Sequence, residues 1–161
     1  MDNNSTLRRL RYALNASDER MAEIFALKGR RMTADQVRAV MLKEDEPGWE
    51  QCGSRQLADF LDGFIISRRG PPRPGTKPST DSLTNNMILK KLRIALKLQE
   101  DDMLRILSSG GQNMSRGELT ALFRKPDHKH YRECGDQAMR YFLKGLTMRL
   151  RPTDHTDGPA A

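Results

Sequence analysis

Leu7-Arg8-Arg9-Leu10-Arg11-Tyr12-Ala13-Leu14 decides the architecture of this chain, because the sequence carries it twice. It returns 82 positions later as Leu89-Lys90-Lys91-Leu92-Arg93-Ile94-Ala95-Leu96. A fixed repeat of this length predicts two copies of one structural unit. The same shift, without a gap, aligns Gly29 and Met32 with Gly111 and Met114, Cys52-Gly53 with Cys134-Gly135, and Phe60-Leu61-x-Gly63 with Phe142-Leu143-x-Gly145.

Each copy has the pattern of four helices. Apolar residues recur at helical spacing, and capping residues precede each apolar run, as Asn4, Ser17, Thr33 and Ser54 do in the first copy. Strand-like alternation is absent, so the sequence predicts an all-α fold. The expected helices are 5–15, 18–28, 34–43, 55–68, 86–97, 100–109, 115–124 and 136–150.

The chain divides at a stretch that cannot continue a helix. Residues 70–78 hold four prolines and two glycines, which predict an extended linker. The expected organisation is a first helical repeat at 3–69, a linker at 70–84, a second helical repeat at 85–151 and a disordered tail at 152–161. Units of roughly 65 residues are near the lower limit for independent folding, so we expect them to bury surface against each other.

The repeated motifs Leu-x-x-Leu-Arg-x-Ala-Leu, Gly-x-x-Met-[Thr/Ser] and Phe-Leu-x-Gly resemble those of the YehS-like family of small bacterial proteins. The resemblance covers residues 3–151 apart from the linker and occurs in both halves. It implies a bacterial cytosolic protein with two copies of a helical domain of unknown function (DUF1456). It implies no catalytic residues.

The positive charge lies almost wholly in the second copy. The formal net charge is +7, and residues 85–151 alone contain 14 Lys and Arg against 7 Asp and Glu. This asymmetry suggests an anionic partner that contacts mainly one half.

The first residues lack the features of a signal peptide, and no apolar run reaches the length of a membrane span. We therefore expect a cytoplasmic protein without a membrane partner.

Basic residues on helix faces are the candidates for phosphate binding. Arg8-Arg9 and Lys90-Lys91 hold equivalent places in the two copies, and a rigid helix face can present cations to successive phosphates. The alternative is a solvated surface that only keeps the protein soluble. The candidate set is Arg8, Arg9, Lys90, Lys91, Arg93, Lys97, Arg140 and Lys144, which Arg149, Arg151, Arg73 and Lys77 could extend.

Few aromatic residues are available for stacking on bases. Trp49 and Tyr131 occupy matching places in the two copies, and Tyr141 is a third candidate. The matching pair suits a structural plug at least as well as base stacking or contact with a protein partner.

Arg11 and Arg93 share a helix face with leucines, so each must extend to solvent or find an acid. Asp45 and Asp127 also correspond across the duplication. We therefore predict structural ion pairs between Arg11 and Asp45 and between Arg93 and Asp127.

Catalytic and metal-binding patterns are weak. His128, His130 and Cys134 offer three zinc-type ligands where a structural site needs four, and the first copy has no equivalent histidines. No histidine accompanies Cys52, which argues against a nucleophilic cysteine. We expect no enzymatic activity, no metal and no cofactor.

Two further features leave alternatives open. Residues 21–43 read as an ordinary helical hairpin rather than a DNA-reading helix-turn-helix, because the turn is too long. Gly63 and Gly145 interrupt the fourth helices, where glycine lowers helix stability, so we expect close helix approach at these points. The contact can lie within each copy or between the two fourth helices.

The sequence therefore favours a non-catalytic protein that binds RNA or DNA through phosphate contacts, mainly by its second repeat. The alternative is a protein-interaction adaptor that uses a groove between the two repeats. The oligomeric state stays open.

Overall fold

The computed structural model describes residues 1–77 and 82–151, and within these residues every regular element is an α-helix. The predicted all-α fold is confirmed. The eight helices are α1 (Asn3–Leu14), α2 (Asp18–Leu27), α3 (Ala34–Met41), α4 (Ser54–Arg69), α5 (Asn85–Leu96), α6 (Glu100–Gly110), α7 (Arg116–Leu122) and α8 (Asp136–Leu150).

Side-chain caps fix several helix starts where the sequence predicts them. Ser17 accepts a hydrogen bond of 3.0 Å from the backbone of Arg20 at the start of α2. Thr33 forms a capping box with Gln36, in which each side chain accepts from the other residue's backbone N–H, at 3.1 and 2.9 Å. Such caps satisfy N–H groups that have no partner inside the helix.

Two of the four N-caps predicted for the first copy are wrong. α1 is capped by Asp2, not Asn4, so the helix begins at Asn3. The N-cap of α4 is Gly53, and Ser54 is the first helical residue. The hydroxyl of Ser54 accepts from the side chain of Asn3 at 3.4 Å, a contact between helices that periodicity along one helix does not reveal.

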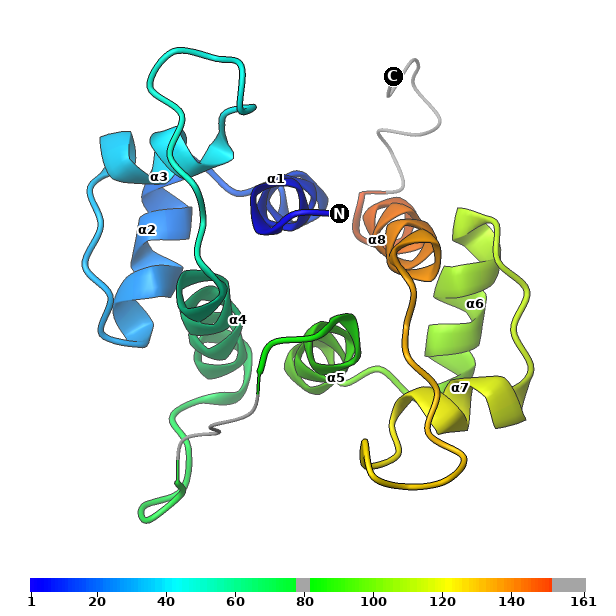
Figure 1. Cartoon of the computed structure of the whole chain (residues 1–161). Coiled ribbons are helices and arrows are strands. Elements are labelled where there is room, and N and C mark those ends of the chain that lie inside the picture. The colour runs from blue at the N-terminus through cyan, green and yellow to red at the C-terminus, as the bar shows by residue number, and fades with distance from the viewer. Residues whose placement is uncertain (78–81, 152–161) are drawn as a thin grey trace.

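The two copies pair through their first and fourth helices (Figure 1). α1 packs against α8, and α5 packs against α4, so each copy's first helix lies on the other copy's fourth helix. Seen as in Figure 1, an approximate half-turn relates α1–α4 to α5–α8. We call these two contacts the α1–α8 junction and the α4–α5 junction.

One hydrophobic core runs through both copies. Its buried cluster includes Leu10 and Phe60 from the first copy and Leu92 and Phe142 from the second, each 0% exposed. The expectation that the copies bury surface against each other is confirmed.

The glycines of the fourth helices serve contacts within each copy. A Cβ at Gly63 would overlap the carbonyl oxygen of Ile24 on α2, and a Cβ at Gly145 would overlap that of Ile106 on α6. Of the two roles that the sequence leaves open, the structure supports close approach of the second and fourth helices of one copy.

Asn4 is buried and holds the segment between α3 and α4. Its side-chain amide donates to the carbonyl oxygens of Val40, at 2.9 Å, and Glu50, at 2.8 Å. Its side-chain oxygen accepts from the backbone N–H of Cys52 at 2.9 Å. Asn86 makes the equivalent three bonds in the second copy. We call these three hydrogen bonds the asparagine clasp; the sequence pattern does not predict it.

Part of the predicted linker and the whole predicted tail lie outside the described residues. Residues 70–77 form no helix, whereas 78–81 and 152–161 are not described. Among residues 1–77 and 82–151, none of the helices combines the length and the apolar character that a bilayer crossing requires.

Candidate nucleic-acid interface

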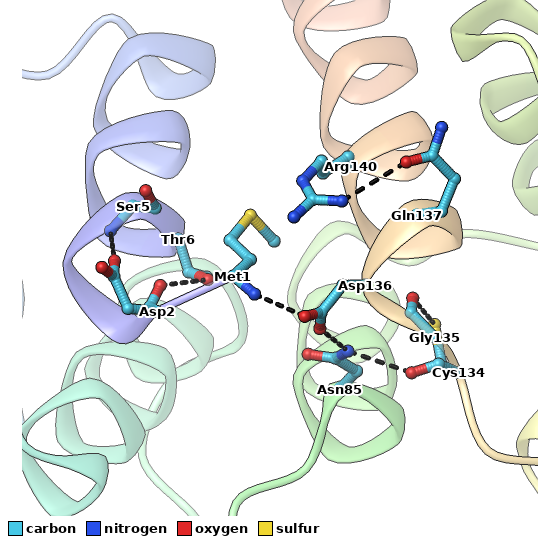
Figure 2. Close-up of polar contacts among 10 residues, drawn as sticks. All are labelled: Met1, Asp2, Ser5, Thr6, Asn85, Cys134, Gly135, Asp136, Gln137 and Arg140. Atoms are coloured by element: carbon cyan, nitrogen blue, oxygen red, sulfur yellow. Dashed lines mark hydrogen bonds and ion pairs between the residues drawn. The ribbon is translucent and has the colours of Figure 1, made fainter.

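The lower end of the α1–α8 junction is held by charged and polar groups (Figure 2). The terminal amino group of Met1 donates to the carboxylate of Asp136 at the start of α8. Asn85 donates to the same carboxylate at 2.9 Å and to the carbonyl oxygen of Cys134 at 3.0 Å. The hydrogen bonds from Met1 and then Asn85 lower the pKa of Asp136.

The other end of this junction is held by Tyr12 and Arg151. Arg151 donates to the backbone oxygen of Tyr12 at 2.9 Å, and its guanidinium carbon lies 4.3 Å from the centre of the tyrosine ring. Tyr12 is nevertheless 45% exposed. A cation over one ring face leaves aromatic surface accessible to a ligand.

Between these two ends lies a groove of about 710 Å³, which we call the α1–α8 groove. α1 contributes two arginines and a tyrosine, and α8 contributes an arginine, a lysine, a second tyrosine and apolar side chains. Its lining consists of Arg8, Arg9, Tyr12, Gln137, Arg140, Tyr141, Leu143, Lys144, Thr147 and Met148. Four of the predicted phosphate-binding residues therefore share one groove.

The four cations of the groove lack carboxylate partners. Within residues 1–77 and 82–151, no ion pair involves Arg8, Arg9, Arg140 or Lys144. Arg8 is positioned by neutral oxygens, donating to Leu42 and Ser5 at 3.0 Å each. Arg140 donates to Gln137 at 3.3 Å (Figure 2). Arg140 also acts through its charge on Asp136, whose pKa it helps to lower, so the groove offers an excess of positive charge to an anion.

A second groove, of about 600 Å³, lies on the second repeat beside α5. Lys90 lines it, together with Arg124, Lys125, Asp127 and Tyr131. It contains one further predicted cation and one predicted stacking residue, but also a carboxylate. We call it the Lys90 groove.

Comparison with known families matches the chain to the family described as "Protein of unknown function (DUF1456)", over residues 3–70 and again over 85–151. The chain belongs to this family. Over 151 residues it is 44% identical to the Uncharacterized protein YehS of Escherichia coli (strain K12), which covers 92% of this chain and 96% of that protein. No solved structure matches.

Membership of the DUF1456 family confirms the tandem duplication that the sequence indicates, since the family model matches twice. The family description and the relative's name state no activity.

Lys91 does not have the free outward position that the sequence suggests. Its ammonium lies 2.5 Å from the carboxylate of Asp62 on α4, and its side chain is only 14% exposed. The cause is the pairing of α5 with α4, which a single-helix pattern cannot reveal. Lys91 is a structural residue of the α4–α5 junction.

Arg93 also has a structural role. Its guanidinium carbon lies 4.9 Å from the centre of the Phe123 ring, and its Nε donates to the backbone oxygen of Leu98 at 3.1 Å.

Lys97 is exposed at the end of α5, where it takes a left-handed backbone conformation with φ of 53°. It lines neither the α1–α8 groove nor the Lys90 groove.

The predicted partners of Arg11 and Arg93 are wrong. Arg11 lies 3.4 Å from Asp18 and donates to Ala16 at 3.2 Å, and no ion pair with Asp45 occurs within the described part of the chain. Arg93 likewise forms no ion pair there with Asp127. Both arginines bind the turn that follows their own helix, because that turn brings a carbonyl oxygen back over it.

Trp49 and Tyr131 are half-buried in loops on opposite sides of the molecule (Figure 1). The loop before α4 carries Trp49, and the loop before α8 carries Tyr131. Partial burial and the nearby Glu133 raise the pKa of Tyr131. Because the two loops lie apart, a single partner groove centred on both residues does not form.

The cysteines are poor nucleophiles. Cys52 and Cys134 are buried, and burial raises the pKa of each thiol to about 11. Both thiols are therefore protonated at neutral pH.

His128 and His130 are exposed, with ring centres 5.6 Å apart. The described residues contain no group of three or more His, Cys, Asp or Glu side chains suited to a metal.

Proposed function

We propose that this chain is a non-catalytic nucleic-acid-binding protein that grips phosphates through basic helix faces. The observation that carries the proposal is the α1–α8 groove, where Arg8, Arg9, Arg140 and Lys144 gather without a carboxylate. Lys90 and its groove extend the basic surface over the second repeat.

Phosphate recognition suits the charges of this groove. Like charges that share a groove repel each other, and this repulsion is relieved when an anion lies between them. Arginine binds phosphate through a planar fork of donors, and lysine binds it as a point charge. The tyrosines of the groove add surfaces on which bases can stack without sequence preference. Binding of this type distinguishes sequences weakly and depends strongly on salt.

The test is the binding of labelled single-stranded RNA and double-stranded DNA to the purified protein over a salt series. We expect at least micromolar affinity at low salt and a log–log slope of roughly one for each phosphate neutralised. The double variant Arg140→Glu/Lys144→Glu should weaken binding by about tenfold or more, because each reversal removes one attraction and adds one repulsion.

The matched control is Arg31→Glu/Arg105→Glu, which changes the net charge equally at exposed positions outside both grooves. It should weaken binding by about threefold or less, since it alters only the long-range field. Equal losses in the two double variants would mean that net charge alone attracts nucleic acid. Absence of binding at low salt would refute the proposal.

The second candidate is a protein-interaction adaptor that uses the same groove. The observation in its favour is the apolar wall of the groove, formed by Leu143 and Met148 beside Tyr12 and Tyr141. Grooves of this kind receive amphipathic segments, and the surrounding cations would select an acidic one. Retention of an acidic peptide together with no affinity for nucleic acid would favour the adaptor.

The finer domain organisation belongs to the same proposal. Each segment matched by the family model contains four helices, which supports a four-helix repeat unit at 3–69 and 85–151. Residues 70–84 then act as the Pro/Gly-rich linker between the units. A cytoplasmic location agrees with nucleic acid as the partner.

A further inference from the structure

The duplication allows the two junctions to be compared position by position. Residue 9 on α1 corresponds to residue 91 on α5, and residue 62 on α4 corresponds to residue 144 on α8, because each pair differs by 82. The α4–α5 junction and the α1–α8 junction thus hold equivalent pairs of positions. The residues at these positions carry different charges in the two junctions.

In the α4–α5 junction the pair is an ion pair that closes the interface. The ammonium of Lys91 lies 2.5 Å from one carboxylate oxygen of Asp62, and that of Lys28 lies 3.6 Å from the other. Two hollows remain beside this pair, of about 30 and about 260 Å³, both smaller than the α1–α8 groove. In this junction the carboxylate of Asp62 therefore lies between two ammonium groups.

In the α1–α8 junction the same two positions carry Arg9 and Lys144, both exposed. A carboxylate has been replaced by an ammonium, so the pair that attracts in one junction repels in the other. Arg140 adds a third cation where α4 has Ala58. Here the junction opens into the groove of about 710 Å³. An anion in this groove would relieve the repulsion between these cations.

We propose that this groove is a single-strand site, in which a backbone phosphate of RNA or DNA lies between Arg9 and Lys144 and a neighbouring base stacks on Tyr12. The inference rests on the proposed function and specifies its ligand. A phosphate supplies between α1 and α8 the negative charge that Asp62 supplies between α4 and α5.

The size of the groove suits nucleotide units of a single strand. Its volume of about 710 Å³ lies in the range of about 300–1,000 Å³ that proteins use for small ligands. Tyr12 is 45% exposed, and the Arg151 guanidinium lies over its ring. An accessible tyrosine beside spaced cations is the combination that proteins use to bind single strands.

The decisive variant is Lys144→Asp, which copies the α4–α5 pair into the α1–α8 junction. Arg9 can then pair with the new carboxylate as Lys91 pairs with Asp62, so the protein should stay folded, which thermal unfolding checks. Binding of fluorescent oligo-U and oligo-dT 12-mers is measured by anisotropy, with a 12-base-pair duplex and uridine monophosphate as comparison ligands. We expect a loss of about tenfold or more for both single strands.

Two further variants separate position from charge. Arg31→Asp makes the same charge change at an exposed site outside the grooves and should weaken binding by about threefold or less. Tyr12→Ala should weaken single-strand binding by about fivefold or more, and Tyr12→Phe should restore it, because stacking needs the ring and not the hydroxyl.

The outcomes distinguish this inference from the proposed function. If the wild type binds but Lys144→Asp behaves like Arg31→Asp, the inference is overturned and nucleic-acid binding by another surface stands. Equal affinity for duplex and single strands, or for uridine monophosphate and the 12-mers, overturns the single-strand assignment. If the wild type binds none of these ligands, the proposed function fails together with the inference.

Discussion

The variant Gly145→Ala is expected to lose about 3 kcal/mol or more of folding free energy. The added Cβ would overlap the carbonyl oxygen of Ile106 on α6, a backbone atom that no rotamer change can move. α8 must therefore shift away from α6 and from the core packed between them. Alanine raises intrinsic helix stability by about 1 kcal/mol, which offsets only part of this cost.

Urea unfolding followed by circular dichroism measures this effect. The matched control is Gly135→Ala at the N-cap of the same helix, where φ is −70° and an added Cβ meets nothing within 4 Å. The control should lose only several tenths of a kcal/mol. If Gly145→Ala were as stable as the wild type, the close approach of α6 and α8 would be contradicted.

The variant Asn86→Ala is expected to lose about 3 kcal/mol, because two buried backbone groups and one part-buried group lose their partners. The side chain of Asn86 donates to Leu122 at 2.9 Å and to Arg132 at 2.8 Å, and it accepts from the backbone N–H of Cys134 at 2.9 Å. Each unsatisfied buried group costs roughly 1–3 kcal/mol, and water entering the site recovers part of the total.

The same unfolding measurement tests this clasp, and Asn113→Ala at an exposed position serves as its control. Asn113 makes one exposed hydrogen bond, with Ser108 at 3.2 Å, so its loss should cost about 1 kcal/mol or less. The first copy provides a replicate, since Asn4→Ala removes the equivalent bonds. Similar stability of Asn86→Ala and Asn113→Ala would show that Asn86 does not hold the loop before α8.

Much of the fold follows from patterns that lie within single helices. The duplication is visible because it needs no gap, and the caps at Ser17 and Thr33 depend on residues three positions apart. Contacts within one turn of a helix are encoded locally, so sequence reasoning recovers them. The all-α class and the order of helices follow from the same information.

The pairing of helices explains most of the errors. Periodicity shows which face of α5 is apolar, but not that α4 will place Asp62 against Lys91. The buried role of Asn4 was missed for the same reason, since its partners lie 36 to 48 positions away. Alignment of the two copies gives one indication of these contacts. It pairs Asn4 with Asn86, which make the same buried hydrogen bonds, and Asp62 with Lys144, which differ in charge.

The candidate site was predicted in part. The sequence offers Arg8, Arg9, Arg140 and Lys144 as cations on helix faces, and the structure brings them into one groove. Tyr12 was not selected, because a residue inside a helix pattern gives no sign that a distant arginine will cover its ring. A groove between repeats depends on how the copies pack, which local patterns do not encode.

Photocrosslinking tests most directly whether nucleic acid occupies the α1–α8 groove. A 12-mer of uridine carrying a photoreactive base is bound, irradiated and digested, and the crosslinked residues are identified by mass spectrometry. If nucleic acid lies in this groove, we expect crosslinks at Tyr12 or Tyr141 that disappear at high salt and with unlabelled competitor. Crosslinks confined to Trp49, Tyr131 or other sites outside the groove would contradict it.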